Sequence, residues 1–534
     1  MSIIIGNSTG TGTGQPIAVP AATAADAPPR PIEFMEISSH DARASAAACL
    51  RWVERAGAEM SARERTSRAQ LSLFGAIVVG ILLGLVWAPR WVAIVLASAT
   101  TAVYLATLAH RIWVFRASFD GHAMHSVGDD EARAFPDSAL PTYTVLVPAF
   151  HEPEIVEGLV RALEAIEYPR DKLEVKLLLE QGDDATIAAT RRIRTALPLK
   201  VLVVPPGKPQ TKPRALNFGL LWSRGEIVTI YDAEDRPEPL QLRRAAIVMA
   251  RNPEMACLQA RLEFHDAERS ALARLFALEY LTWFRCFLPG LVNTGGVLPL
   301  GGTSNHFRRS SLVAAGAWDA FNVTEDADLG IRMQRLGFDI GVLDSVTYEE
   351  ANGDPINWIK QRSRWQKGYL QTALVHLRHP LLLRRQLGWR GLMHLVLFVA
   401  GTPLLALCNM AFWALSLVWG ATQAHVIQAA FPGVVYYLAV GSWLIGNATI
   451  AYLGAVTLLE ADRPELFSAV LMTSLYWILM SIASVRAAIQ LVVDPFHWEK
   501  TAHGVGATRD RTEDDPDDAE RADEVVIDLT EPAR

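Results

Sequence analysis

Acidic side chains gather at three points in the middle of the chain, each shortly after an apolar run. The segment DAEDRPEP places Asp232, Glu234 and Asp235 within four residues. Carboxylates this close repel one another, and a hard divalent cation held between them and a phosphate group relieves that repulsion. Oxygen ligands suit Mg²⁺ or Mn²⁺. The segment therefore predicts a metal site, with Glu234 and Asp235 both open as the second ligand; a solvated acidic loop is the ordinary alternative.

The other two acidic points precede this segment. PAFHEPE contains Glu152, which could accept a hydrogen bond from a ribose or a base. EQGDD supplies three further carboxylates, those of Glu180, Asp183 and Asp184. All three stay eligible as contacts to a nucleotide base.

Further along, FNVTEDADLGIRM places Thr324, Glu325 and Asp326 at the start of a predicted helix. Thr324 is a plausible N-cap, which is the simplest explanation of this pattern. A carboxylate is also suited to general-base chemistry, and Asp326 could take the proton from an attacking hydroxyl group. The Gly-containing segment LGGTSNHFRR, shortly before it, permits close approach of the backbone to a ligand.

Basic and aromatic side chains with complementary chemistry lie in two other segments. TKPRALNFG contains Lys212 and Arg214, which could contact phosphates as a point charge and as a fork. QRSRWQKG places Gln361, Arg364 and Trp365 on neighbouring turns of a predicted helix. Arg364 can hold a diphosphate, and Trp365 offers a flat face on which a pyranose can stack. A tryptophan of this kind can also be an anchor at a membrane surface.

The elements that must position these residues are short β-branched runs between polar amphipathic stretches. The predicted strands are 143–147, 175–179, 201–204 and 227–231. Strands alternating with helical patterns predict an α/β domain with a mostly parallel sheet. Ligands of such sheets bind beyond the carboxyl ends of the strands, which is where the acidic segments fall.

Long apolar stretches flank this domain. Two precede it, at 71–87 and 91–109, and three follow it, at 391–419, 434–459 and 466–493. The lengths suit membrane-spanning helices, although a buried hairpin is an alternative for the first two. Arginines are frequent just before the first stretch and occur again after the second, so the domain is expected on the cytoplasmic side.

Composition supports a chain that is part soluble and part membrane-embedded. Of its 534 residues, 51% are hydrophobic, yet 20% are charged. Residues 505–534 hold eleven acidic residues and four arginines, which accounts for the net charge of −7 and leaves the rest nearly neutral. No basic surface for nucleic acid is indicated. The four cysteines are far apart, with neither a disulfide framework nor a zinc-binding spacing.

Taken in order, DAED, TED and QRSRW resemble the membrane-bound family 2 glycosyltransferases, the group of the cellulose, curdlan, chitin and hyaluronan synthases. The resemblance implies a GT-A-type α/β domain inserted between transmembrane helices, a UDP-sugar donor, a divalent metal and inversion at the anomeric carbon. It assigns Asp232 and Glu234 to the metal and diphosphate and Asp326 to the base. Gln361, Arg364 and Trp365 would hold the pyrophosphate and the acceptor.

DPFHWEKTAHG, after the last apolar stretch, resembles a segment that swings over the donor site in some members of that group, with Lys500 and Thr501 facing the diphosphate. That role requires a cytoplasmic position. Three single crossings after the domain would put the segment on the opposite side. We therefore expect one long apolar stretch to be re-entrant or to count twice.

These observations predict the following organisation: a disordered tail (1–40), a basic cytoplasmic helix (41–70), two transmembrane helices (71–110), the catalytic domain (111–371), an interfacial helix (372–390), C-terminal transmembrane helices (391–493), the gating-like segment (494–504) and an acidic disordered tail (505–534). The expected location is the bacterial inner membrane, with several crossings.

The expected activity is processive synthesis of a β-linked polysaccharide from UDP-glucose or UDP-N-acetylglucosamine, with export through the protein's own channel. The growing glycan, the lipid bilayer and possible accessory export proteins would be its partners. One alternative is transfer of a single sugar to a lipid phosphate. Another is a transporter or sensor with a degenerate nucleotide-sugar domain.

Overall fold

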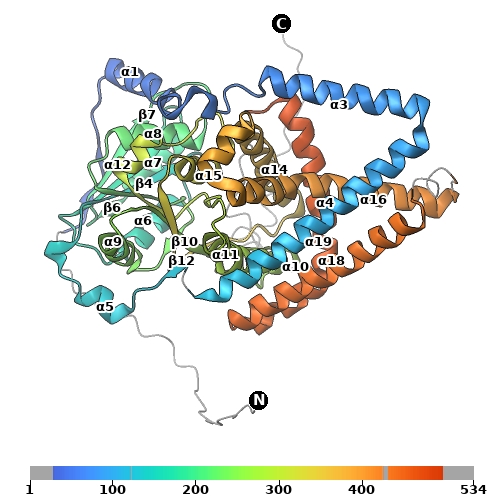
Figure 1. Ribbon diagram of the computed structural model, residues 1–534. Helices are drawn as coiled ribbons and strands as arrows, with labels where there is room; N and C mark the ends of the chain where they lie inside the picture. Colours follow the sequence, from blue (N-terminus) through green and yellow to red (C-terminus); the bar gives the residue numbers. More distant parts are fainter. Residues whose placement is uncertain (1–27, 122, 424, 426–430, 497–534) are drawn as a thin grey trace, which may run out of the picture.

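A sheet domain and a set of long helices make up the molecule, and the long helices project together from one side of the sheet domain (Figure 1). The computed structural model describes residues 28–121, 123–423, 425 and 431–496. Lys500 and Thr501, the acidic tail and most of the N-terminal tail lie outside these residues.

The centre of the sheet consists of the four predicted strands. They are β4 (Tyr143–Ala149), β5 (Leu173–Glu180), β7 (Leu199–Val204) and β8 (Ile227–Ile230). All pair in parallel, in the order β7-β5-β4-β8. Most of their residues are buried on both faces, which explains why they read as mainly apolar runs.

The remaining strands make the sheet mixed. β11 (Asn305–Arg308) runs antiparallel to both β8 and β10 (Met255–Phe264), and β10 pairs in parallel with β12 (Asp339–Glu349). The short strands β3 (Met124–His125) and β9 (Arg236–Pro237) both pair with β12. Ten strands therefore form one sheet, and the acidic segments follow β4, β5 and β8 near its middle.

Helices cover both faces of the sheet, so the domain has two cores. Along β4, Val145 and Val147 face a core built with α6 (Val156–Glu164) and α9 (Gln241–Arg251). Leu146 faces the opposite core, which includes α8 (Lys212–Leu221) and α13 (Glu325–Arg335). This alternation is the ordinary two-residue period of a strand.

The N-terminal region corrects the expected disordered tail. Arg30–Pro31 (β1) pairs with Arg194–Thr195 (β6), and Glu33–Phe34 (β2) extends the main sheet beside β7. α1 (Ser39–Cys49) then packs on α8. Such short strands gain order by pairing with an edge that already exists, so their own composition does not reveal them.

Six helices are long and apolar enough to cross a membrane within the described residues. They are α3 (Arg68–Trp87), α4 (Pro89–Ala117, extended to Asp120), the segment Ala271–Asn293, the segment Pro380–Thr422, α18 (Gly433–Glu460) and the segment Pro464–Val493. The segment Ala271–Asn293 was not expected from the sequence. It contains α10 (Ala271–Leu281), the π-helical η4 (Thr282–Phe287) and α11 (Leu288–Asn293). Because 72% of its apolar window is buried in the protein, against none for α3, it lies inside the structure.

Both ends of α19 (Phe467–Val493) contact the sheet domain. Before it, Arg463 lies 3.9 Å from Glu263 at the end of β10. After it, the carbonyl oxygen of Pro495 accepts a hydrogen bond at 2.8 Å from Gln371 on α14 (Pro355–His376). A helix of this length is about 40 Å long and would suffice to cross a bilayer. The expectation that one apolar stretch is re-entrant or counts twice stays a prediction.

Candidate active site

A cavity of about 290 Å³ lies between the sheet domain and the long helices. Nine of the residues selected from the sequence line it: Lys212, Asp232, Glu234, Thr324, Glu325, Asp326, Gln361, Arg364 and Trp365. They come from the loop after β8, from the starts of α8 and α13, and from α14. The fold thus brings together four segments that are far apart in the sequence.

Lys212 contacts both the acidic loop after β8 and the glycine-containing segment around Gly302. Its ammonium group forms an ion pair with Asp232 and donates a hydrogen bond of 2.8 Å to the carbonyl oxygen of Gly302. A Cβ atom placed on Gly302 would lie 3.3 Å from Oδ2 of Asp326. The absence of a side chain at Gly302 therefore lets the backbone lie close to Asp326, as the glycine-containing segment suggested.

Asp235 has a different position from its two acidic neighbours. It is 1% exposed and does not line the cavity. Its Oδ2 accepts hydrogen bonds from the backbone N–H of Asp232, at 2.7 Å, and from the hydroxyl of Thr303. Burial, together with the charge of Asp232, raises the pKa of Asp235 well above its usual range. Asp235 therefore stabilises the conformation of the loop through these hydrogen bonds. Asp232 and Glu234 are the carboxylates of this loop that line the cavity.

The start of α13 brings two carboxyl groups of unequal acidity to the cavity. Burial raises the pKa of Asp326 to about 6, against the opposing effects of its hydrogen bond from Ala327 and the charges of Lys212 and Arg364. Burial and repulsion from Asp326 raise the pKa of Glu325 to about 8. At neutral pH the negative charge therefore resides mainly on Asp326, which suits a general base.

Thr324 holds the N-cap position of α13, but its side chain makes no capping hydrogen bond, so that part of the prediction is wrong. Its hydroxyl group instead lies 3.5 Å from Oδ1 of Asn322. On its other side Thr324 packs against Gly368 of α14.

Buried ionic contacts fix α13 against α14. Arg332 donates to Asp328 at 3.0 and 3.2 Å, and both side chains are fully buried. Nε2 of His376, at the end of α14, lies 3.1 Å from the other oxygen of Asp328. Arg335 contacts Nδ1 of His376 at 2.9 Å. The helix that carries Asp326 is thus held to the helix that carries Arg364 and Trp365.

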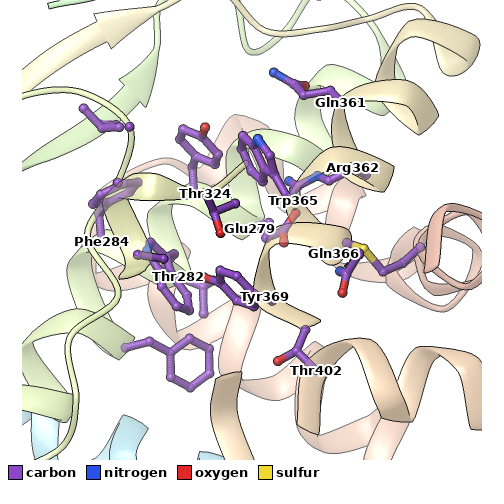
Figure 2. Close-up of a pocket in the computed structure, with 18 of the residues that line it drawn as sticks. Glu279, Thr282, Phe284, Thr324, Gln361, Arg362, Trp365, Gln366, Tyr369 and Thr402 are labelled. Atoms are coloured by element: carbon purple, nitrogen blue, oxygen red, sulfur yellow. Dashed lines mark hydrogen bonds and ion pairs between the residues drawn. The ribbon is translucent and has the colours of Figure 1, made fainter. Parts of the chain in front are cut away.

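Arg362 and Trp365 of α14 lie beside each other at the cavity (Figure 2). The guanidinium carbon of Arg362 lies 4.3 Å from the ring centre of Trp365, and the ring of Tyr280 stacks on Trp365 at 6.1 Å. Arg362 also forms an ion pair with Glu279 and donates to the hydroxyl of Tyr476 at 3.1 Å. These contacts hold Trp365 in a fixed orientation at the cavity.

Sequence reasoning missed several lining residues, among them Glu279, Tyr280, Glu349, Arg362, Tyr369 and Tyr476. Two of them carry a detectable signal. Glu279 is a charged residue inside an apolar stretch, which often marks a functional position. Glu349 ends β12, where carboxyl-end chemistry is expected.

Five predicted donor contacts do not line this cavity: Glu152, Glu180, Asp183, Asp184 and Arg214. Glu180 and Arg214 form a buried ion pair at 3.2 Å. Asp183 caps α7 (Asp184–Arg192) by accepting from the backbone N–H of Thr186 at 3.2 Å. Their predicted contacts to the donor nucleotide stay a prediction.

The cavity continues from Trp365 towards the long helices. The residues there come from α4, α18, α19 and the π-helical η5 with α16 (Leu395–Ala400 and Gly401–Thr422), and include Leu108, Arg111, Phe398, Thr402, Leu453, Trp477 and Met480. A second cavity of about 90 Å³ shares Arg111, Thr402 and Trp477 with the first. It adds the polar and aromatic side chains of Tyr104, Asn409, Trp413, Trp443, Asn447 and Ser474.

Residues 141–368 match the family model described as "Glycosyltransferase like family 2". This range contains the four central strands of the sheet and the nine residues that were selected from the sequence and line the cavity. This segment is thus similar to the family 2 glycosyltransferases. The predicted GT-A-type α/β domain between long apolar helices is thereby confirmed at the level of fold.

Curated proteins similar to this chain carry different names. The chain is 25% identical over 250 residues to the probable glycosyltransferase YdaM of Bacillus subtilis, which covers 46% of this chain and 60% of that protein. It is 27% identical over 387 residues to the beta-monoglucosyldiacylglycerol synthase of Synechocystis, covering 70% of this chain and 77% of the relative. Glucomannan 4-beta-mannosyltransferase 2 of Arabidopsis thaliana is 25% identical over 251 residues, 45% of this chain and 46% of the relative.

A solved mannosyltransferase, PcManGT from Pyrobaculum calidifontis in complex with GDP-Man and Mn²⁺, is 18% identical, with a TM-score of 0.47 over 74% of this chain and 99% of that one. A likeness of this degree does not align the two sites residue by residue.

Proposed function

We propose that the protein is an inverting glycosyltransferase that transfers a hexosyl group from a UDP-sugar to an acceptor hydroxyl reaching the site from the membrane side. One observation carries the proposal. A single cavity is lined by the acidic loop, by Asp326 and by Trp365, and it continues between the long helices. The arginines before α3 support a cytoplasmic domain and an inner-membrane location.

The lining residues suit an in-line displacement at the anomeric carbon. Asp326 takes the proton from the acceptor hydroxyl while that oxygen forms the new glycosidic bond. The bond from the anomeric carbon to the diphosphate oxygen breaks on the opposite face, and the electron pair leaves with the nucleoside diphosphate. Lys212 and Arg364 are the cations placed to stabilise that leaving charge.

The acidic loop fits a divalent cation only if the donor also supplies ligands. Asp232 and Glu234 offer hard oxygen ligands at the cavity. Within the described residues no group of three or more His, Cys, Asp or Glu side chains could hold a metal alone. Mg²⁺ commonly binds through one or two carboxylates together with substrate phosphates, which matches this arrangement. A bound cation would add positive charge beside the departing diphosphate.

The favoured acceptor is the end of a growing β-linked glycan. Trp365 and Tyr280 give the acceptor side stacking surfaces. The second cavity, deeper among the helices, carries asparagine, serine and tryptophan side chains that can contact sugar hydroxyls and rings. Processive synthesis with passage of the product between the helices is consistent with these groups.

A lipid acceptor is the second candidate, supported by a separate observation. The part of the first cavity beside Leu108, Phe398, Leu453 and Met480 is apolar enough to hold an acyl chain. The relative from Synechocystis is, by its name, a glycolipid synthase.

Product analysis tests both candidates. Purified protein in lipid nanodiscs is given a panel of UDP-sugars with Mg²⁺ or Mn²⁺, with and without diacylglycerol. A polymer whose linkage is then read by methylation analysis supports the first candidate, and a single-sugar product extractable into chloroform supports the second. Absence of transfer from every nucleotide sugar would contradict the proposed function.

A further inference from the structure

α15 (Pro380–His394) presents exposed basic and apolar side chains beside the membrane helices. Leu381 and Trp389 are 75% and 67% exposed, and Arg384, Arg385 and Arg390 are exposed with them. We call these five residues the α15 face. Gly388, with φ of 70°, kinks the helix immediately before Trp389.

The charge of the α15 face is not balanced by the protein. None of its three arginines forms an ion pair with another residue in the described part of the chain. Exposed guanidinium groups next to an exposed leucine and tryptophan are typical of a helix lying among lipid headgroups, with arginines at phosphates and apolar side chains at the acyl boundary.

The α15 face lies at the start of a candidate membrane segment. Beyond the kink at Gly388, α15 continues into η5 and α16, and all three belong to one candidate membrane segment, Pro380–Thr422. Trp389 lies six residues before Leu395, the start of η5, which is about 9 Å along a helix axis. An acidic soluble protein is a less suitable partner, because it would have to compete with lipid headgroups for a face at the bilayer surface.

We propose that the α15 face binds anionic phospholipid headgroups of the leaflet on the side of the sheet domain. The partner is thus a negatively charged bilayer surface, recognised by Arg384, Arg385 and Arg390, with Leu381 and Trp389 inserted beside them.

The same helix touches the active-site framework from its other side. Gln386 of α15 accepts a hydrogen bond of 2.8 Å from Arg335, which in turn contacts His376 at 2.9 Å. His376 lies against Asp328, two residues after Asp326. Anionic lipid bound to α15 would therefore also restrain α13, the helix that carries Asp326. A resulting effect on the rate of sugar transfer rests on the proposed function.

Hydrogen–deuterium exchange measures the lipid contact without requiring activity. The full chain is placed in nanodiscs of phosphatidylcholine alone or of phosphatidylcholine with phosphatidylglycerol, and exchange is followed in the peptide 380–390. We expect slower exchange with phosphatidylglycerol, and loss of this difference in the triple variant Arg384→Gln, Arg385→Gln, Arg390→Gln. The matched control is Arg191→Gln with Arg192→Gln, exposed arginines at the end of α7, which should keep the difference.

Three outcomes would overturn the inference: equal exchange in both lipids, a difference that persists in the triple variant, or the same protection on adding inorganic phosphate to phosphatidylcholine nanodiscs. Transfer assays in the same nanodiscs separate the two proposals. Phosphatidylglycerol-dependent protection without any transfer would leave the lipid contact standing and contradict the proposed function alone.

Discussion

Gly368 and Thr324 are in contact because Gly368 has no side chain: a Cβ atom there would lie 2.3 Å from Oγ1 of Thr324. The pair joins α14 to the start of α13, and the two helices carry opposite walls of the cavity. There is no space for a methyl group at this point, so the distance between the two walls depends on glycine at position 368.

Gly368→Ala should therefore push α13 away from α14 and reduce transfer. Overpacking of this kind costs about 1–3 kcal/mol, which should also lower the thermal unfolding midpoint. Gly158→Ala is the matched control, because Gly158 is exposed on α6 with nothing within 4 Å of its Cβ position. Alanine there should preserve activity and slightly raise stability. Equal behaviour of the two variants would show that the contact is not critical.

The pH dependence of transfer should report the state of Asp326. A general base must be deprotonated, and burial raises the pKa of Asp326 to about 6. kcat/KM should consequently be constant near neutral pH and fall about tenfold per unit as the pH drops below about 6. UDP binding, measured by calorimetry over the same range, serves as the control. A profile that follows UDP affinity, or an active Asp326→Asn variant, would remove Asp326 from the role of base.

The effect of Mn²⁺ on UDP affinity should depend on the carboxylates that face the cavity and not on Asp235. Asp232→Ala should abolish transfer and eliminate the increase in UDP affinity on adding Mn²⁺. Asp235→Asn keeps a hydrogen-bond acceptor for Asp232 and Thr303, so it should retain the Mn²⁺ effect. Isothermal titration with and without Mn²⁺ compares them. Full activity of the parent protein in EDTA would contradict the metal assignment.

Trp365→Ala should remove about 1–3 kcal/mol of packing at the acceptor side while leaving UDP affinity nearly unchanged. Turnover should collapse, since the acceptor is no longer held against the base. The measurement pairs UDP affinity with product yield on folded protein. Trp365→Phe retains a ring beside Arg362 and Tyr280 and should keep part of the activity. A Trp365→Ala variant with the parent turnover would show that this side chain does not hold the acceptor.

Asp328→Ala should destabilise the protein by about 3–5 kcal/mol, because it leaves the guanidinium of Arg332 buried without its charge partner. The comparison is Glu157→Ala, which breaks an exposed pair with Arg161 and should leave the unfolding midpoint unchanged. Unfolding of detergent-solubilised protein gives both values. An unchanged midpoint for Asp328→Ala would mean that water reaches Arg332 in solution.

The central strands could be predicted because their signal is local. β4 and β5 are largely buried on both faces, so each reads as a mainly apolar run, although Lys176 interrupts the run of β5. β10 is different, because Gln259, Arg261 and Glu263 occupy it and are buried. These polar groups are accommodated by distant partners such as Arg285, 22 residues away from Glu263. A pattern based on neighbouring residues contains no information about such partners.

The site shows the same division. Asp232, Asp326 and Trp365 could be selected because each belongs to a short segment with its own chemistry. The contacts of Arg362 with Glu279 and Tyr476 join residues 83 and 114 positions apart and depend on how α10 and α19 pack. Asp183 and Arg214 were predicted to contact the donor; the side chain of Asp183 caps the start of α7, and that of Arg214 pairs with Glu180. Direction is a property of the folded backbone.

The attachment of α19 at both ends has a mechanical consequence. The helix supplies Tyr476, Trp477 and Met480 to the inner cavity wall, and its ends are fastened to β10 and α14 through Arg463 and Pro495. A change in bilayer thickness tilts membrane helices that are exposed to lipid along their length, such as α3, whose apolar window is not buried in the protein. The two end contacts of α19 restrict such tilting, so we expect the wall next to the reacting groups to keep its alignment when the surrounding membrane deforms.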